Sequence, residues 1–340
     1  MSGDQKPAWW IYQGTGLPRA ERDLPAVLPA PPGWRSFDGG PALPPPAEHD
    51  GEFHRRLGAA SPVSGIKATQ DELNMVNAAI YLRRPLLVTG RPGTGKSSLA
   101  YKIARELRLG QVLRWPITSR SAARDGLWEY DAIGRVQATA GGSGEAGIGD
   151  FVQLGPLGTA LLPYDQPRVL LIDELDKSDI DLPNDLLNIF EDGEYDVPPL
   201  VRVAATEPEV SVFTADRGER ATVREGRVRC RAFPIIVVTS NGEREFPPAF
   251  LRRCLRLDMR APGIEQLVTM VSAHFPGTEV QHGTELVRAF VDRSTREGGL
   301  AADQLLNAVF LATSGAFQQD EKWDLLRDAL WQRLGAAETD

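Results

Sequence analysis

The chain has 340 residues with 42% hydrophobic content, which is enough to bury the core of one large domain or of two modest ones. A formal net charge of −8 disfavours nucleic acid as a partner, and the two cysteines, Cys230 and Cys254, lack the CxxC spacing of a disulfide framework or a zinc site. The N-terminal apolar cluster is too short for a signal peptide and no apolar run approaches the ~20 residues of a membrane span, so we expect a cytoplasmic protein without membrane contact.

Residues 1–61 form a proline-rich N-terminal extension that contains the stretch LPAVLPAPPG. Proline blocks both helices and strand ladders, so we interpret this extension as a tail that lies on the domain or waits for a partner, and not as part of a core. Its aromatic side chains are costly to leave in water, and we expect them to dock on the chain's own domain or on a separate partner. They are Trp9, Trp10, Tyr12 and Trp34.

A glycine-rich stretch, GRPGTGKSS, follows a predicted buried strand at residues 86–88 and precedes a predicted helix at residues 97–107. This strand–loop–helix context is the one that a GxxxxGK[ST] phosphate-binding loop requires. Glycine lets the backbone amides turn toward an anionic phosphate, and the helix N-terminus adds its dipole. We expect Lys96 to reach the β and γ phosphates of ATP and Ser97 to ligate Mg²⁺. The predicted nucleotide-binding residues are Gly90, Arg91, Pro92, Gly93, Thr94, Gly95, Lys96, Ser97 and Ser98.

A second buried strand is predicted within RVLLIDELDKSD, where apolar residues 169–172 precede two acids. Ligands of open α/β sheets bind at the carboxyl ends of the strands, which is where Asp173 and Glu174 stand. We expect Asp173 to belong to the Mg²⁺ shell and Glu174 to polarise the attacking water as a general base. The adjacent glutamate favours an ATP hydrolase over a plain kinase or GTPase.

Between residues 200 and 232, apolar and charged residues alternate around turn signals, which predicts a β-hairpin insert with one turn at Glu225-Gly226. The arginines of this segment could contact nucleic acid, but their alternation with apolar residues is more simply the solvated face of a hairpin. We predict no DNA binding from them. They are Arg224, Arg227, Arg229 and Arg231.

A third buried strand, at residues 235–238, leads to Asn241 and then to a short helix that ends in Arg252 and Arg253. We expect Asn241 to orient the lytic water or to touch the γ-phosphate. Arginines at a helix end can also simply complement the helix dipole, and we keep that alternative for Arg252 and Arg253.

Helical spacing of apolar residues from residue 261 onward predicts an all-helical C-terminal region. We therefore expect an α/β fold, in which a parallel sheet with helices on both faces is followed by a small helical lid. The expected division is an extension at 1–61, an ATPase core at 62–260 with the hairpin insert, and a lid at 261–340.

The ordered segments GRPGTGKS, LLIDELDKSD, VVTSN and FPPAFLRRC, followed by a helical region, resemble the AAA+ ATPases. Within that family, YDAIGR at 130–135, FVQLGPLGTALL at 151–162 and LPNDLLNIFEDGEYDVP at 182–198 look most similar to the MoxR-like branch. The resemblance covers about residues 62–320, and its phosphate loop and acidic strand end are the specific part.

This resemblance implies a homo-oligomer, a hexameric ring with ATP at the subunit interfaces, which remodels or chaperones a protein partner. MoxR-like proteins often work with von Willebrand factor A domain proteins, and a prokaryotic regulatory or defence system is the implied setting. Lys96, Ser97, Asp173, Glu174 and the sensor-1 residue Asn241 match the family pattern. Arg253 corresponds to the arginine finger that acts in trans, with Arg252 as the alternative.

The sequence departs from the family in the lid, where GGLAADQLL places Asp303 near the position of the sensor-2 arginine. Arg293 and Arg296 are only nearby, so no sensor-2 residue is assigned. The glycine-rich segment 138–150 is interpreted either as a surface loop or, by the resemblance, as an insertion that faces the ring pore.

Two other function classes stay open at this stage. One is a nucleotide-switched scaffold, which Glu174 speaks against because a binding-only ring needs no water-activating base. The other is a DNA-associated motor subunit of a restriction-type complex. Stimulation of ATP hydrolysis by DNA or by a protein would separate a motor from a remodeller.

Overall fold

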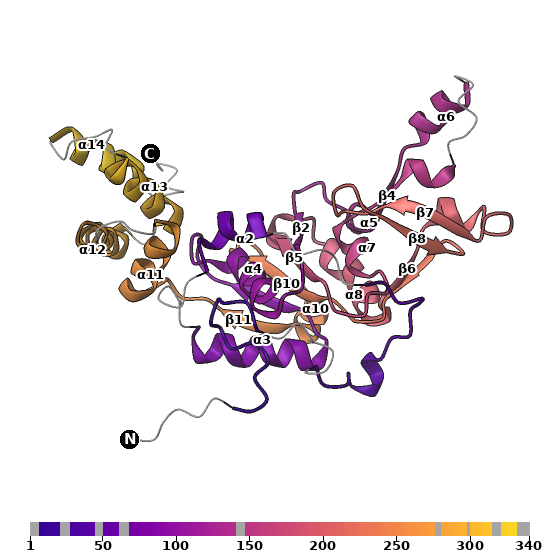
Figure 1. Cartoon of the computed structure of the whole chain (residues 1–340), viewed down its shortest axis with the longest axis horizontal. Coiled ribbons are helices and arrows are strands. Elements are labelled where there is room, and N and C mark those ends of the chain that lie inside the picture. Colours follow the sequence, from indigo (N-terminus) through magenta and orange to yellow (C-terminus); the bar gives the residue numbers. More distant parts are fainter. Residues whose placement is uncertain are drawn as a thin grey trace.

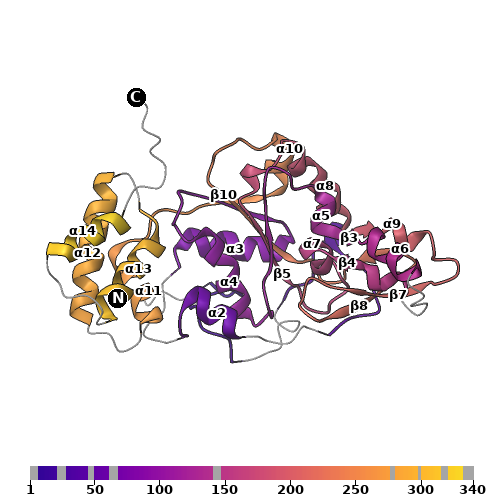
Figure 2. The same ribbon diagram turned by 90° about the horizontal axis from the view of Figure 1, so that it is seen from above.

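A computed structural model of the chain describes residues 7–20, 28–44, 50–60, 68–140, 147–275, 280–297, 300–314 and 321–331. A parallel sheet of five strands in the order β11-β1-β10-β5-β2 lies at its centre and confirms the predicted α/β fold (Figures 1 and 2). The strands are β1 (Leu86–Thr89), β2 (Leu113–Pro116), β5 (Val169–Asp173), β10 (Ile235–Ser240) and β11 (Leu255–Asp258).

The three central strands are buried on both faces, as expected for a parallel sheet between two helical layers. Along β5, for example, Val169 and Leu171 belong to one core cluster, whereas Leu170 and Ile172 belong to the cluster on the opposite face. The pairing of Val238 with Ile172 brings the carboxyl ends of β10 and β5 to the same edge of the sheet. The predicted site residues after each strand therefore meet at that edge.

The helices of the α/β region cover both faces of the sheet. Helices α3 and α4 supply the core on one face with Val76 and Leu99, and α7 and α8 supply the other with Leu157 and Leu186. The helices are α2 (Asp50–Leu57), α3 (Gln70–Leu82), α4 (Lys96–Leu107), α5 (Ala123–Leu127), α6 (Ala132–Ala140), α7 (Pro156–Ala160), α8 (Leu182–Asp192), α9 (Pro198–Val201) and α10 (Pro248–Arg253). Short 3-10 turns are η1 (Gly33–Arg35), η3 (Ile148–Phe151) and η4 (Leu175–Lys177).

A second sheet of six strands lies at one end of the molecule (Figure 2). Its strands run in the order β3-β4-β7-β8-β9-β6, with bounds Trp128–Tyr130, Val152–Leu154, Glu209–Phe213, Arg220–Arg224, Arg227–Arg229 and Glu194–Asp196. The predicted turn is present, since Glu225 and Gly226 both have positive φ and join β8 to β9, as a two-residue hairpin turn requires.

The four arginines of this segment are exposed to solvent, as predicted, and each pairs with an acid. Their nitrogen–oxygen distances are 3.1 Å for Arg224–Glu209, 3.0 Å for Arg227–Asp196, 2.9 Å for Arg229–Asp38 and 3.1 Å for Arg231–Asp165. The local positive charge is therefore balanced within the chain.

The interpretation of the N-terminal extension as a tail outside the core is wrong for its described parts. Residues 7–20, which we call the arm, place Trp10, Ile11 and Tyr12 in the core beside α3 and α4. The backbone of the arm needs no strand partner there because side chains bind its amides. Asn77 Oδ1 accepts from the Ile11 and Tyr12 amides, and the Glu106 carboxylate accepts from three further amides of the arm.

The four aromatic side chains of the extension differ in their surroundings. Tyr12 is fully buried and donates to Glu72 Oε1 at 2.8 Å, while Trp9 meets the Tyr81 ring edge-on at 5.9 Å between centroids. Together with Trp10, these residues dock on the chain's own domain. Trp34 does not, since 80% of its surface is exposed.

The C-terminal helices form a lid with its own core beside the sheet (Figure 1). They are α11 (Ile264–His274), α12 (Val280–Glu297), α13 (Ala302–Thr313) and α14 (Glu321–Leu330). Over the described residues, no helix combines the length and the apolar character needed to cross a membrane. Residues 141–146 of the glycine-rich segment lie outside the described residues, so its two interpretations stay predictions.

Candidate active site

The glycine-rich loop between β1 and α4 has a backbone that other residues adopt only with strain. Gly93 and Gly95 have φ angles of +77° and +88°, in the left-handed region that favours glycine. A Cβ on Gly93 would also lie 2.3 Å from the Cα of Ala301, so the loop touches the lid through this glycine. A Cβ on Gly95 would have no neighbouring atom within 4 Å. The loop is thus fixed on its lid side and open at the start of α4.

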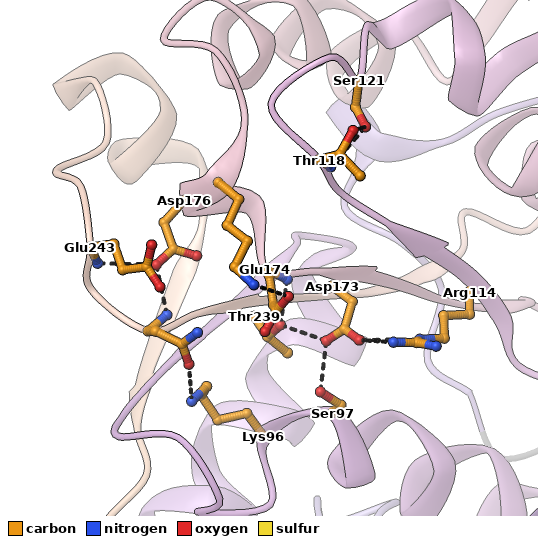
Figure 3. A network of polar contacts seen from close by, with 12 residues as sticks. Lys96, Ser97, Arg114, Thr118, Ser121, Asp173, Glu174, Asp176, Thr239 and Glu243 are labelled. Carbon is orange, nitrogen blue, oxygen red and sulfur yellow. Dashed lines mark hydrogen bonds and ion pairs between the residues drawn. The ribbon is translucent and has the colours of Figure 1, made fainter. Parts of the chain in front are cut away.

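Lys96 is the first residue of α4, and its ammonium group lies inside the loop. It donates to the carbonyls of Gly90 and Arg91 at 2.7 and 2.9 Å. It also donates to Asn241 Oδ1 at 2.8 Å (Figure 3). Burial lowers the pKa of Lys96, although the nearby carboxylates of Asp176, Glu174 and Asp173 favour its charged form. A cation thus lies where the loop would meet an anionic ligand.

The Asp173 carboxylate at the end of β5 is held by three donors. Ser97 Oγ and Thr239 Oγ1 donate to Oδ1 at 2.6 and 2.9 Å, and Arg114 donates to Oδ2 at 2.6 Å (Figure 3). Burial alone would raise the pKa of Asp173, but these hydrogen bonds outweigh it and leave the pKa below its ordinary value. The carboxylate is therefore kept ionised.

Ser97 and Asp173, the two expected metal ligands, thus lie in direct contact. One hydroxyl and one carboxylate oxygen suit Mg²⁺, which takes few protein ligands and completes its shell with water and phosphate. Within the described ranges, no group of three or more His, Cys, Asp or Glu side chains could hold a metal by protein ligands alone.

Glu174 follows β5 in a left-handed backbone conformation, with φ of 63°. Its amide donates to Thr239 Oγ1 at 2.8 Å, and its carboxylate accepts from Lys177 Nζ at 2.7 Å. The carboxylate is only partly shielded, and the residue lines the cavity described below. Glu174 thus stands at the expected place, with Lys177 as an ion-pair partner.

Asp176 and Arg114 are two residues of this edge that we did not predict. Asp176 is 2% exposed, and its Oδ2 accepts from the amides of Asn241 and Glu243 at 2.9 and 3.1 Å. It therefore fixes the segment that carries Asn241. Asp176 could have been predicted, because it lies in the acidic segment LLIDELDKSD. Arg114 could not, because nothing in its segment LRWP indicates a contact with Asp173.

A cavity of about 590 Å³ lies between the phosphate loop, the start of α3, helix α2 and the lid. This volume falls in the usual range for small-molecule sites. Away from the loop its walls combine apolar side chains of Leu57, Leu267 and Met270 with polar groups of Thr69 and His274. Leu57 lies in the predicted extension, so the extension contributes to this cavity.

The predicted arginines are not brought to this cavity within one chain. Arg253 Nε donates to Glu191 Oε1 at 2.5 Å, and neither Arg252 nor Arg253 is among the described residues that line the cavity. Asp303 lines it, in agreement with the departure noted in the lid, whereas Arg293 pairs with Asp328.

Residues 85–254, half of the chain, match the family model described as AAA domain (dynein-related subfamily). Comparison with the curated proteins gives no match. Among solved structures, the chain is similar to NtrX from Brucella abortus in complex with ADP, at 14% identity and a TM-score of 0.35, over 79% of this chain and 56% of that one. It is also similar to C. elegans PCH-2, at 15% identity and a TM-score of 0.36, over 84% of this chain and 72% of that one.

Proposed function

Since this chain belongs to the AAA domain family, dynein-related subfamily, we propose that it is a Mg²⁺-dependent ATPase that works as a ring and remodels a protein partner. One observation carries the proposal. Lys96, the Ser97–Asp173 pair, Glu174 and Asn241 come from three separate segments and meet at one sheet edge beside a cavity. This is a set of groups for holding a triphosphate and activating water.

Each group at this edge has a role in the proposed reaction. Lys96 exchanges its loop carbonyls for phosphate oxygens, and the open position at Gly95 leaves room for them. Ser97 and Asp173 would hold Mg²⁺, which when bound neutralises charge on the phosphates. The apolar walls of the cavity at Leu57 and Met270 suit a nucleobase.

The attacking water is assigned to Glu174 and Asn241. As general base, Glu174 takes the proton of the water, while Lys177 donates to its Oε2. Asn241 orients the water or contacts the γ-phosphate, and Asp176 keeps its backbone in place. A scaffold without turnover would have no use for such a base.

Arg252 and Arg253 are not among the described residues that line the cavity, which supports completion of the site by a neighbouring subunit. We assign Arg253 as the finger that enters the next subunit's site, with Arg252 as the alternative. A hexameric ring of the MoxR-like type with a von Willebrand factor A domain partner, and the division at 61/62 and 260/261, belong to the same proposal.

The test mixes two inactive variants. Arg253→Ala should keep ATP binding, because Lys96, Ser97 and Asp173 are in cis, while hydrolysis falls by up to roughly 10³–10⁵-fold. Lys96→Ala should not bind ATP. A mixed ring contains interfaces where an intact loop faces an intact finger, so activity should partly return on mixing.

The control for the mixing assay is a measurement of subunit exchange. Subunit exchange is followed with two fluorophores. If exchange occurs and activity stays at zero, or if Arg253→Ala hydrolyses ATP normally, the trans assignment to Arg253 is wrong and Arg252→Ala is measured next. Stimulation of hydrolysis by DNA and not by protein would favour the motor alternative.

A further inference from the structure

We propose that residues 28–44, which we call the strap, serve the subunit interface, and that Arg35 is a positioning residue for Arg253. The inference rests on the proposed function, because it presumes that Arg253 acts in a neighbouring subunit. It gives the proline-rich extension a role in hydrolysis that neither its composition nor the family match assigns.

Arg35 is a buried cation whose hydrogen bonds go to main-chain carbonyls. It is 8% exposed, and burial lowers its pKa. Its NH2 and NH1 groups donate to the carbonyls of Arg83 and Phe190, both at 2.7 Å. Its guanidinium lies over the rings of Phe37 and Phe233, at 5.3 and 4.4 Å from their centroids. The planar group is thus held from its edges and from its faces.

The two carbonyls belong to the C-terminal ends of two helices. Arg83 is the C-cap of α3, and Phe190 lies in the last turn of α8. Carbonyls at a helix C-terminus lack helical partners, and a cation there also complements the helix dipole. One side chain of the strap therefore fixes α3 and α8 relative to each other.

Both of these helix ends also hold α10. On the α8 side, Glu191 Oε1 accepts from Arg253 Nε at 2.5 Å, while the Glu191 carbonyl accepts from Arg35 at 3.3 Å. On the α3 side, Arg84 donates to the carbonyl of Arg252 at 3.4 Å. Arg83 in turn bonds the strap, because its side chain donates to the Pro29 carbonyl at 2.8 Å.

Arg35 thus supports both polar contacts that join these helix ends to α10, which is also anchored in the core by Phe250. A group that acts on a transferring phosphoryl must be placed to within a fraction of an ångström, and an error of 1 Å can cost about 10²-fold in rate. Loss of Arg35 leaves the buried Phe190 carbonyl and the part-buried Arg83 carbonyl without this donor, and it removes the bond to the Glu191 carbonyl. The effect should appear in the neighbouring subunit's site and not in the subunit's own loop.

The experiment uses the full chain with Arg35→Met and the two partners of the mixing assay. Alone, Arg35→Met should bind ATP within about threefold of the unmodified protein and hydrolyse it at least about tenfold more slowly, within the range that misplacement causes. Mixed with Lys96→Ala, which has an intact finger, it should recover activity. Mixed with Arg253→Ala, it should recover none, because both variants lack a working finger.

A matched control is Arg168, another buried arginine, which pairs with Asp216 at 2.7 Å. Its side chain bonds Tyr164, Asp216 and the Gln111 carbonyl, which lie outside α3, α8 and α10. Arg168→Met should lower the melting temperature and leave hydrolysis per folded subunit unchanged in every mixture. If Arg35→Met does not fold, the same mixtures are made with Arg35→Lys, which keeps the cation and loses the planar fork.

Three results would overturn the inference. The first is recovery of ATP hydrolysis when Arg35→Met is mixed with Arg253→Ala. The second is no recovery when Arg35→Met is mixed with Lys96→Ala although the subunits exchange. The third is normal hydrolysis by folded Arg35→Met alone. They leave the proposed function standing if Arg253→Ala itself is inactive and recovers with Lys96→Ala. Normal hydrolysis by Arg253→Ala removes both the trans assignment and this inference.

Discussion

The sheet edge and the N-terminal extension both bury charged side chains, but they use them in different ways. At the edge, Lys96 and Asp173 are bonded mainly to side chains and loop atoms beside a cavity. Around the extension, Arg35 of the strap and Glu106 of α4 are bonded mainly to backbone groups. A ligand can replace the first kind of contact, whereas loss of the second leaves a buried group unsatisfied. Variants at the sheet edge should therefore lose ATP binding or hydrolysis, whereas variants around the extension should lose stability.

The largest expected effect is at the edge, in Lys96→Ala. The variant should lose ATP binding at accessible concentrations and remain folded, because the ammonium group contacts an exposed loop and supports no core. Calorimetric titration measures the affinity, and circular dichroism checks the fold. Binding like that of the unmodified protein would contradict the assignment of the phosphate loop, and unfolding would contradict the contrast between the two regions.

Glu174→Gln should lower hydrolysis by roughly 10²–10⁴-fold, the usual scale for a general base, and keep ATP binding. The substitution preserves size and leaves Asp173 untouched. Glu243→Gln is the matched control, since Glu243 takes part in the edge through its backbone amide and its side chain is exposed. Near-normal turnover by Glu174→Gln would place the base elsewhere, and loss of binding would make Glu174 a metal ligand.

The sequence was sufficient to predict which residues meet at the sheet edge, because each part of the edge is a short continuous segment. A strand, a turn and a helix start lie within about ten residues at the phosphate loop, and the acids follow directly on a buried strand. Parallel pairing then brings the strand ends together without further information. What was missed, such as Arg114, depends on a side chain that reaches across from a neighbouring strand.

The extension was not predictable in the same way. Glu106 bonds amides about 90 residues away along the chain, and Arg35 bonds a carbonyl 155 residues away. No periodicity or local spacing contains such partners. The proline content was interpreted correctly as an obstacle to helices and strands, but side chains of α3 and α4 replace the missing ladder.

A smaller effect, on stability, is expected where the arm is anchored. Glu106 is 1% exposed and accepts from the Thr15 amide and hydroxyl at 2.7 and 3.0 Å. Glu106→Gln should lower the free energy of unfolding by about 1–3 kcal/mol, the scale for a buried charged acceptor, and should expose the arm to protease. Glu209→Gln, in an exposed pair with Arg224, should cost below about 1 kcal/mol. Equal losses in both variants would mean that the arm is not held by Glu106.

The smallest effect is expected from a local opening of the strap, which Cys230 can report. Gly39 of the strap donates to the Cys230 carbonyl at 3.0 Å, and Phe37 stacks on Phe233 with centroids 5.4 Å apart. Burial raises the pKa of Cys230 to about 12, so at pH 8 its thiolate fraction is roughly 10³-fold below that of a free cysteine. Alkylation of the native protein should be slow and should speed up about tenfold per pH unit.

Cys254 supplies the internal control, because burial raises its pKa to about 12 as well. Phe37→Ala removes the stacked ring but leaves Arg35 in place, so the strap should open locally while the sheet stays folded. We expect alkylation of Cys230 to accelerate severalfold in a Cys254→Ala background, and that of Cys254 to change less in a Cys230→Ala background. Equal acceleration at both cysteines would show that the strap opens only when the whole domain unfolds. In that case the extension unfolds together with the domain as one cooperative unit. The extension and the sheet edge then differ only in what their charged side chains bond, and not in how readily they open.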